Sequence, residues 1–188
     1  MKKALPFFLV AIVCLTLAFR YLRADLPSFT ETSTDGAGNI ADFTQPLPRT
    51  VLPALDGKWV NLETYKGKVV LINFWTTWCP GCRDEMPDLI RLQQQFASSG
   101  FTVVALAVDD EGEESVSAYV RNESFSVDGS SMKINFPVLL GSGESAQKIG
   151  FEGGLPASVL VNRDGQEVKL IRGPVHVQEV SKLIKRLL

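Results

Sequence analysis

Two cysteines in a C-x-x-C arrangement, Cys79 and Cys82, lie between a predicted strand and a predicted helix. Residues 69–74 before them read Val-Val-Leu-Ile-Asn-Phe, a short apolar run rich in β-branched side chains that is typical of a buried strand. After them, apolar residues recur at helical spacing until Gly100 ends the pattern. These residues are Met86, Leu89, Ile90, Leu92 and Phe96. The chain must therefore place its cysteine pair where a strand ends and a helix begins.

The position of Cys79 at a helix start favours the ionised form of its thiol. Unpaired backbone N–H groups and the helix dipole stabilise an anion there and lower the pKa of a thiol. Cys79 is therefore predicted to be the nucleophile. Cys82, one turn into the helix, can reach back and close a small disulfide ring, so the pair can alternate between dithiol and disulfide.

A zinc site and a purely structural disulfide are the other interpretations of this pair. A zinc ion needs two more ligands, and the chain offers only Cys14 and His176, neither at ligand spacing. A C-x-x-C near a strand-helix-strand pattern is the signature of redox chemistry. We therefore expect no metal and no cofactor other than the redox-active Cys79–Cys82 disulfide itself.

The rest of the sequence predicts an α/β fold with helices on both faces of a mixed sheet. An Asp-Gly pair at residues 56–57, between two alternating runs, predicts a hairpin ahead of this core. Residues 122–134 are given no assignment. The other expected elements are a strand at 102–108, a helix at 113–121, a short helix within 141–150, strands at 157–161 and 167–171, and an amphipathic helix at 177–188.

The stretch V-V-L-I-N-F-W-T-T-W-C-P-G-C-R-D-E-M-P, residues 69–87, resembles the thioredoxin-like proteins of the TlpA/ResA type. These are membrane-tethered thiol–disulfide oxidoreductases of bacteria. The resemblance continues through residues 135–138, 154–158 and 162–165, and so covers most of the chain from about residue 46 onward. It implies a thioredoxin-like domain with an N-terminal β-hairpin and disulfide-exchange activity on protein cysteines.

Glu85 is a candidate for control of the thiols. It lies three residues after Cys82, so on a helix it shares a face with the disulfide. The alternative is an exposed acid that only favours the helix dipole. The resemblance implies a functional role, because ResA-like proteins carry at this place an acidic residue that helps govern the thiols. Asn73 occupies the strand position where cytoplasmic thioredoxins have a buried carboxylate, which makes Glu85 the better candidate for a proton acceptor.

The Leu155-Pro156 step is a second candidate part of the site. A proline at the head of a strand costs no ladder hydrogen bond and needs no functional explanation. The resemblance implies more: a cis bond packed against the cysteine pair, with the adjacent backbone free to pair with an extended substrate. We therefore assign Pro156 to the catalytic site and Leu155 to the substrate-binding surface.

The residues around the cysteines complete the predicted substrate surface. Trp75 and Trp78 flank the pair and are candidates for an apolar collar on which a partner docks, with core burial as the alternative for Trp75. Trp78, Pro80 and Gly81 are assigned to substrate binding. His176 is expected at the surface.

The first segment of the chain predicts a membrane anchor. Lys2 and Lys3 precede an apolar run over residues 4–19, which Arg20 and Arg23 follow. A single-pass anchor over residues 1–23 is favoured over a cleaved signal peptide, because no small-x-small cleavage site follows, although the run is short for a membrane span. Residues 24–45 are small and polar and predict a tether, and residues 46–188 form the domain, expected outside the cytoplasmic membrane.

Charge narrows the range of partners. The chain has 19 basic and 21 acidic residues and a formal net charge of −2. Every acidic residue follows Arg23, so the predicted domain is more acidic than the whole chain. An acidic domain without a basic stripe argues against nucleic acid or anionic lipid as a direct ligand.

The leading hypothesis is a membrane-anchored oxidoreductase that reduces disulfides of proteins outside the cytoplasm and is recharged by a membrane-embedded thiol donor. Apocytochrome c, other envelope dithiols and metal-centre cysteines are all possible substrates. A Cu(I) metallochaperone that uses both thiolates is one alternative. A thiol peroxidase on the same fold is another, although Thr76-Thr77-Trp78-Cys79 lacks the proline of the peroxidase motif.

Overall fold

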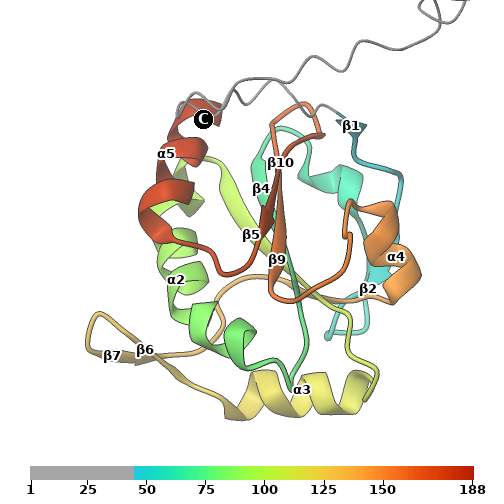
Figure 1. Ribbon diagram of the computed structural model, residues 1–188, viewed down its shortest axis with the longest axis vertical. Coiled ribbons are helices and arrows are strands. Elements are labelled where there is room, and N and C mark those ends of the chain that lie inside the picture. The colour runs from blue at the N-terminus through green and yellow to red at the C-terminus, as the bar shows by residue number, and fades with distance from the viewer. Residues whose placement is uncertain (1–44) are drawn as a thin grey trace, which may run out of the picture. The chain divides into compact units, whose positions relative to one another are not determined.

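The computed structural model describes residues 45–188 (Figure 1). The predicted anchor, and the predicted tether apart from Gln45, lie outside these residues. Within the described part of the chain, no helix combines the length and the apolar character needed to cross a membrane.

A six-stranded mixed sheet forms the centre of the domain, in the order β1-β10-β9-β4-β5-β8 (Figure 1). β4 runs parallel to β5 and antiparallel to β9, while β5 runs parallel to β8. β9, β10 and β1 pair antiparallel. The bounds are β1 Gln45–Pro46, β4 Val69–Trp75, β5 Phe101–Ala107, β8 Val138–Leu140, β9 Ala157–Val161 and β10 Gln166–Arg172.

Helices cover both faces of this sheet, as the sequence predicts. Alternate residues of β4 point to opposite faces, so Leu71 packs on the side of α2 and α5, whereas Ile72 packs on the side of η2 and α4. The helical segments are η2 Leu62–Tyr65, α2 Pro80–Phe96, η3 Ala97–Ser99, α3 Glu113–Asn122, α4 Gly143–Lys148 and α5 Val177–Leu187.

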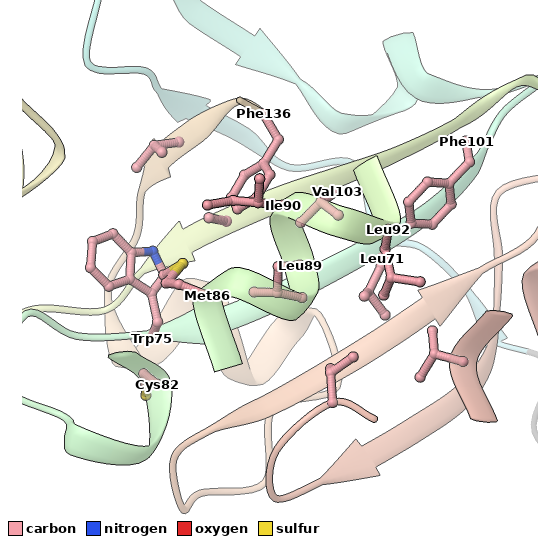
Figure 2. Packing of buried hydrophobic residues seen from close by; sticks show 14 of the residues in the cluster. Leu71, Trp75, Cys82, Met86, Leu89, Ile90, Leu92, Phe101, Val103 and Phe136 are labelled. Carbon is pink, nitrogen blue, oxygen red and sulfur yellow. The ribbon is translucent and has the colours of Figure 1, made fainter. Parts of the chain in front are cut away.

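The apolar stripe of α2 forms the centre of one core. Figure 2 shows Met86, Leu89 and Ile90 on the helix face that packs against the sheet, beside Leu71 and Val103. All five side chains are fully buried. The helix ends through η3 at Gly100, whose φ of 92° lies in the left-handed region that favours glycine. The predicted extent of this helix is therefore confirmed.

Two hairpins lie outside the main sheet. β2 (Val51–Pro53) and β3 (Trp59–Asn61) pair antiparallel around Asp56-Gly57, which confirms the predicted hairpin. β6 (Phe125–Val127) and β7 (Ser130–Met132) form a second one, within residues 122–134, where the sequence pattern predicts no element. Its turn is Asp128-Gly129, with φ angles of 50° and 80°. The sequence contains the same Asp-Gly turn signal there, but the strand on each side of it has only three residues, too few to show an alternating pattern.

The two outermost strands of the sheet were also not predicted. β1 has two residues and β8 has three, too few to show an alternating pattern. Their place is decided by pairing with β10 and β5, which are distant in the sequence. The structure thus adds edges to a sheet whose centre the sequence predicts.

The burial of Leu89 gives a test of the core. Leu89→Ala should lower the free energy of unfolding by about 2–5 kcal/mol, because it removes buried methyl groups and leaves a cavity between α2 and the sheet. Val51→Ala is the matched control, since Val51 is 52% exposed and its truncation should change stability by less than about 0.5 kcal/mol. Urea unfolding of both variants measures the difference, and equal effects would contradict this description of the core.

Candidate functional site: a disulfide at the start of α2

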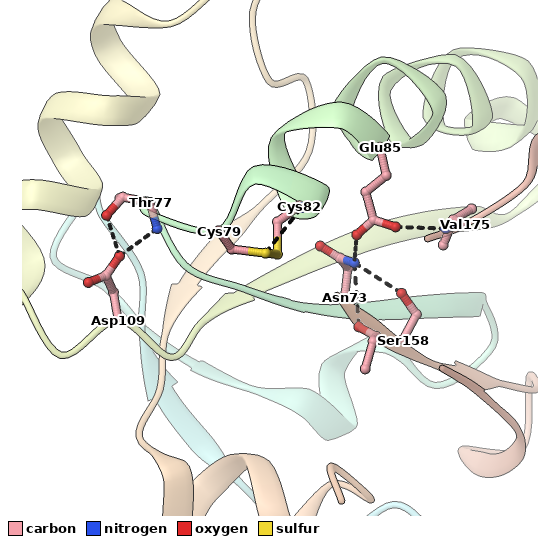
Figure 3. Close-up of a disulfide and its surroundings, with 9 residues drawn as sticks. Asn73, Thr77, Cys79, Cys82, Glu85, Asp109, Ser158 and Val175 are labelled. Carbon is pink, nitrogen blue, oxygen red and sulfur yellow. Dashed lines mark hydrogen bonds between the residues drawn. A yellow bond between two sulfur atoms is a disulfide. The ribbon is translucent and has the colours of Figure 1, made fainter. Parts of the chain in front are cut away.

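The disulfide joins Cys79 and Cys82 at the first turn of α2 (Figure 3). Cys79 is the N-cap residue, with φ −83° and ψ 110°, and its Sγ accepts a hydrogen bond of 3.1 Å from the backbone N–H of Cys82. Pro80 follows at the first helical position, where its missing N–H costs nothing. The sulfur of Cys79 therefore lies at the positive end of the helix dipole, as predicted.

The sequence predicts that Cys79, as the cysteine at the helix start, is exposed, but the structure largely buries it. Cys79 is 5% exposed and Cys82 is fully buried, so the nucleophile is the more accessible of the two but is not an open surface residue in the disulfide form. The reason is packing, since both cysteines belong to the core cluster on the α2 side of the sheet.

The loop before Cys79 is tied to the end of β5. The carboxylate of Asp109 accepts hydrogen bonds of 2.6 Å from both the backbone N–H and the hydroxyl of Thr77 (Figure 3). Asp110 accepts a bond of 3.2 Å from the indole N–H of Trp78. The sequence pattern by itself does not place these two carboxylates at the site. Their position directly after the strand parallel to β4 was the available signal, because parallel strands end at the same edge of a sheet.

The Leu155–Pro156 bond is cis, which confirms the form implied by the resemblance. Pro156 packs against the first turn of α2, since a Cβ placed on Gly81 would lie 3.2 Å from its Cδ. A glycine at position 81 therefore permits the close approach of the proline ring to the cysteine pair. Leu155 is partly buried and contacts both core clusters.

The two tryptophans beside the cysteines have different surroundings. Trp78 is 56% exposed, which fits its predicted place on a docking surface. Trp75 is fully buried, and the centroids of its ring and of the Tyr119 ring lie 5.2 Å apart. The collar interpretation is therefore wrong for Trp75. As the last residue of β4, Trp75 points to the α2 face of the sheet, where the core covers it.

Glu85 is buried beneath the disulfide end of α2, with only 2% of its surface exposed. One carboxylate oxygen accepts a bond of 2.7 Å from Asn73 Nδ2, and the other accepts a bond of 2.7 Å from the backbone N–H of Val175 (Figure 3). The alternative of an exposed helix-start acid is therefore wrong. Sequence spacing placed Glu85 on the disulfide face, but only the packing of β4 and of the loop before α5 buries it.

Burial raises the pKa of Glu85 from 4.5 to about 7. Loss of solvation is the largest cause, and the nearby charge of Asp88 acts in the same direction. The hydrogen bonds from Val175 and Asn73 favour the anion and offset part of this rise. The carboxyl group can thus gain or lose a proton near neutral pH.

Asn73 links Glu85 to the sheet. Its Nδ2 group also lies 3.0 Å from Ser158 Oγ and 3.5 Å from the carbonyl oxygen of Ala157 on the neighbouring strand β9. Asn73 is fully buried, because it lies in the middle of β4 and points to the α2 face of the sheet. The buried carboxylate at this site therefore comes from the helix, while the strand contributes a neutral amide.

Residues 45–188 contain no group of three or more histidine, cysteine, aspartate or glutamate side chains positioned to hold a metal ion. His176 is exposed at the N-cap of α5, as predicted.

The mixed sheet, the disulfide at the helix start and the cis-proline packed against it define a thioredoxin-fold protein with a redox-active cysteine pair. The chain belongs to the Redoxin family, whose pattern it matches over residues 26–187. Its relatives include the thiol–disulfide oxidoreductases ResA of Bacillus subtilis and of Bacillus thuringiensis subsp. konkukian. The first is 33% identical over 141 residues, 73% of each chain. The second is 30% identical over 146 residues, 78% of this chain and 79% of the relative.

Solved structures agree with this assignment. A thiol:disulfide interchange protein from Chlorobium tepidum is 30% identical and superposes with a TM-score of 0.64 over 77% of this chain and 96% of its own. A secreted thiol–disulfide isomerase from Corynebacterium glutamicum shares the fold at a TM-score of 0.67 and 20% identity, over 84% of this chain and 97% of its own. The chain is thus a thiol–disulfide oxidoreductase that resembles ResA.

The raised pKa of Glu85 predicts a pH dependence of stability. A carboxyl group whose pKa is higher in the folded than in the unfolded state stabilises the fold fully below pH 4.5, and this contribution is lost as pH rises through about 7. Glu85→Gln should remove this fall in stability. Urea unfolding of the oxidised protein at pH values from about 4.5 to about 8 measures it.

Glu113→Gln is the control for this measurement. Glu113 lies exposed in the first turn of α3, so its change removes one carboxylate without touching the buried site. The control should keep the pH dependence of the parent protein. A Glu85→Gln variant with an unchanged pH profile would mean that the carboxyl group ionises as freely as an exposed one.

Proposed function

We propose that this protein is an extracytoplasmic disulfide reductase, held at the cytoplasmic membrane by residues 1–23 and acting on disulfides of envelope proteins. The observation that carries the catalytic part is the Cys79–Cys82 disulfide at the start of α2, with the buried Glu85 one turn farther along the helix. The apolar run over residues 4–19, with basic residues at both ends, supports the anchor.

Reduction of a partner proceeds by two exchanges. The Cys79 thiolate attacks one sulfur of the partner disulfide and forms a mixed disulfide, and the partner's other sulfur leaves as a thiolate that takes a proton. The Cys82 thiolate then attacks the Cys79 sulfur, closes the internal disulfide and releases the second partner thiolate, which is also protonated. Two electrons pass from the cysteine pair to the partner, and both thiol protons leave with them.

Cys82 must lose its proton before the second exchange. Glu85 is our candidate acceptor, because it follows Cys82 by one helical turn and its pKa of about 7 allows a carboxylate to take a proton near neutral pH. The exposed Trp78 and the cis-Pro156 loop are our candidates for the surface on which the partner lies, since both border the disulfide in sequence or in space.

The reductive direction is supported by the resemblance to TlpA/ResA-type proteins and by the compartment. Exported proteins meet an environment that oxidises thiols without further help, so an additional reductase is the useful activity there. Such a reductase needs electrons, and we propose a membrane-embedded thiol donor that carries cytoplasmic reducing equivalents outward. The predicted tether over residues 24–45 would keep Cys79 within reach of that donor.

The different roles of the two cysteines predict different effects of their substitution. Cys79→Ser should abolish disulfide exchange, whereas Cys82→Ala should accumulate mixed disulfides, because the second exchange cannot occur. Non-reducing electrophoresis and mass spectrometry of protein trapped in cells detect these adducts and name the partners. Preferential alkylation of Cys82 in the reduced protein at mildly acidic pH would reverse the assignment, and stoichiometric Cu(I) binding without any exchange would favour a metallochaperone instead.

The reductive direction of exchange predicts the location and the redox state of the protein in cells. It should fractionate with the cytoplasmic membrane, be mainly reduced, and become oxidised when the thiol donor is deleted. Its potential should lie nearer the roughly −270 mV of thioredoxin than the roughly −120 mV of a strong oxidant. Thiol trapping in intact cells measures the redox state. A mainly oxidised protein with a potential at the oxidant end would point to an oxidase or isomerase.

A further inference from the structure

Within residues 45–188, the side-chain amide of Asn73 has one hydrogen-bonding atom without a partner. Asn73 is fully buried, and among residues 45–188 its Oδ1 has no hydrogen-bond donor. Buried polar atoms in folded proteins are nearly always paired, so an acceptor left free inside the active site calls for an explanation. Its surroundings supply one.

The orientation of this amide is fixed by its other contacts. Nδ2 donates to Glu85 Oε1 at 2.7 Å and lies 3.0 Å from Ser158 Oγ. In the reverse orientation Oδ1 would face the carbonyl oxygen of Ala157, which can only accept, and also a carboxylate oxygen whenever Glu85 is ionised. Figure 3 shows the result: Nδ2 faces Glu85, and Oδ1 points to the side of the disulfide sulfurs.

The disulfide itself cannot satisfy this acceptor. Neither sulfur carries a proton in the oxidised protein, and Cys82 is fully buried. Reduction adds two electrons and two protons to the S–S bond and produces a thiol on each cysteine. The Cys79 thiol ionises more readily than the Cys82 thiol, because it lies at the helix start. The Cys82 thiol then carries a proton, and the unpaired amide oxygen points to its side of the site (Figure 3).

We infer that Asn73 is a positioning residue whose Oδ1 accepts the hydrogen bond of the Cys82 thiol in the reduced protein. This bond needs the S–H group of Cys82, so it is absent from the disulfide form. It keeps the proton on Cys82 while Cys79 is the thiolate, and it stabilises the reduced form, which makes the reduction potential less negative. The inference deepens the proposed function, because it rests on exchange at the Cys79–Cys82 pair.

Infrared spectroscopy tests the bond directly. The full-length reduced Cys79→Ala variant retains the thiols of Cys14 and Cys82, and Cys79→Ala/Cys82→Ala retains only that of Cys14. Their difference spectrum isolates the S–H stretching band of Cys82. This band should lie below the frequency of a free thiol and return toward it when Asn73→Leu is added. A band at the free-thiol frequency with Asn73 present would overturn the inference, whether or not Asn73→Leu folds.

The equilibrium with a reference dithiol gives a second measurement. Asn73→Leu should lower the equilibrium constant for reduction of the Cys79–Cys82 disulfide about tenfold, a potential ~30 mV more negative. The shift should persist when both proteins also carry Glu85→Gln, which separates this bond from any effect through the carboxylate. Ser158→Ala, which removes another contact of Nδ2, should leave the constant within about twofold.

The outcomes separate the two proposals. An unchanged constant in Asn73→Leu, or a shift that disappears in the Glu85→Gln background, overturns the inference while exchange by the parent protein continues. A parent protein that does not exchange with any dithiol overturns the proposed function, and the infrared band still decides whether the bond to Cys82 forms.

Discussion

The central strand β4 is the constraint on which the site depends. All seven of its residues are buried, and it pairs on one edge with β5 and on the other with β9. A strand held in this way cannot shift by one residue without turning every side chain to the opposite face. It therefore fixes which residues face α2, and it delivers the following loop to the start of that helix. The disulfide, the buried amide of Asn73 and the cis-Pro156 bond, which directly precedes the paired strand β9, all take their positions from this strand.

The second feature of the site is that its buried carboxylate belongs to a residue of helix α2 and not to a residue of strand β4. Glu85 reaches inward from α2, while Asn73 on β4 and a backbone N–H before α5 donate to its two oxygens. Three elements from distant parts of the chain thus enclose one ionisable group. Because burial opposes its charge and these donors favour it, the pKa of the carboxyl group lies near neutrality, where a small change in surroundings alters its protonation.

Much of the fold could be predicted because its central elements have strong local signals. β4, β5 and α2 show long apolar runs or clear helical periodicity. The predicted bounds of β4 and β5 agree with the structure to within a residue, and α2 begins at the cysteine pair as predicted. The edge strands β1 and β8 and the β6–β7 hairpin were missed, because strands of two or three residues carry no measurable periodicity. The collar interpretation of Trp75 failed for a related reason: sequence proximity to a cysteine does not tell which face of a sheet a side chain occupies.

The sequence alone determined that a C-x-x-C pair begins a helix after a buried strand, since apolar spacing and β-branched composition are local properties. From that order follow the nucleophile's position and the redox chemistry. Only the tertiary structure decided that Glu85 is buried and that Asp109 and Asp110 hold the loop before Cys79. It also decided that one oxygen of Asn73 has no donor within the part of the chain that the structure describes. Burial and hydrogen-bond pairing are sums over neighbours far apart in the chain, and no local pattern of residues contains them.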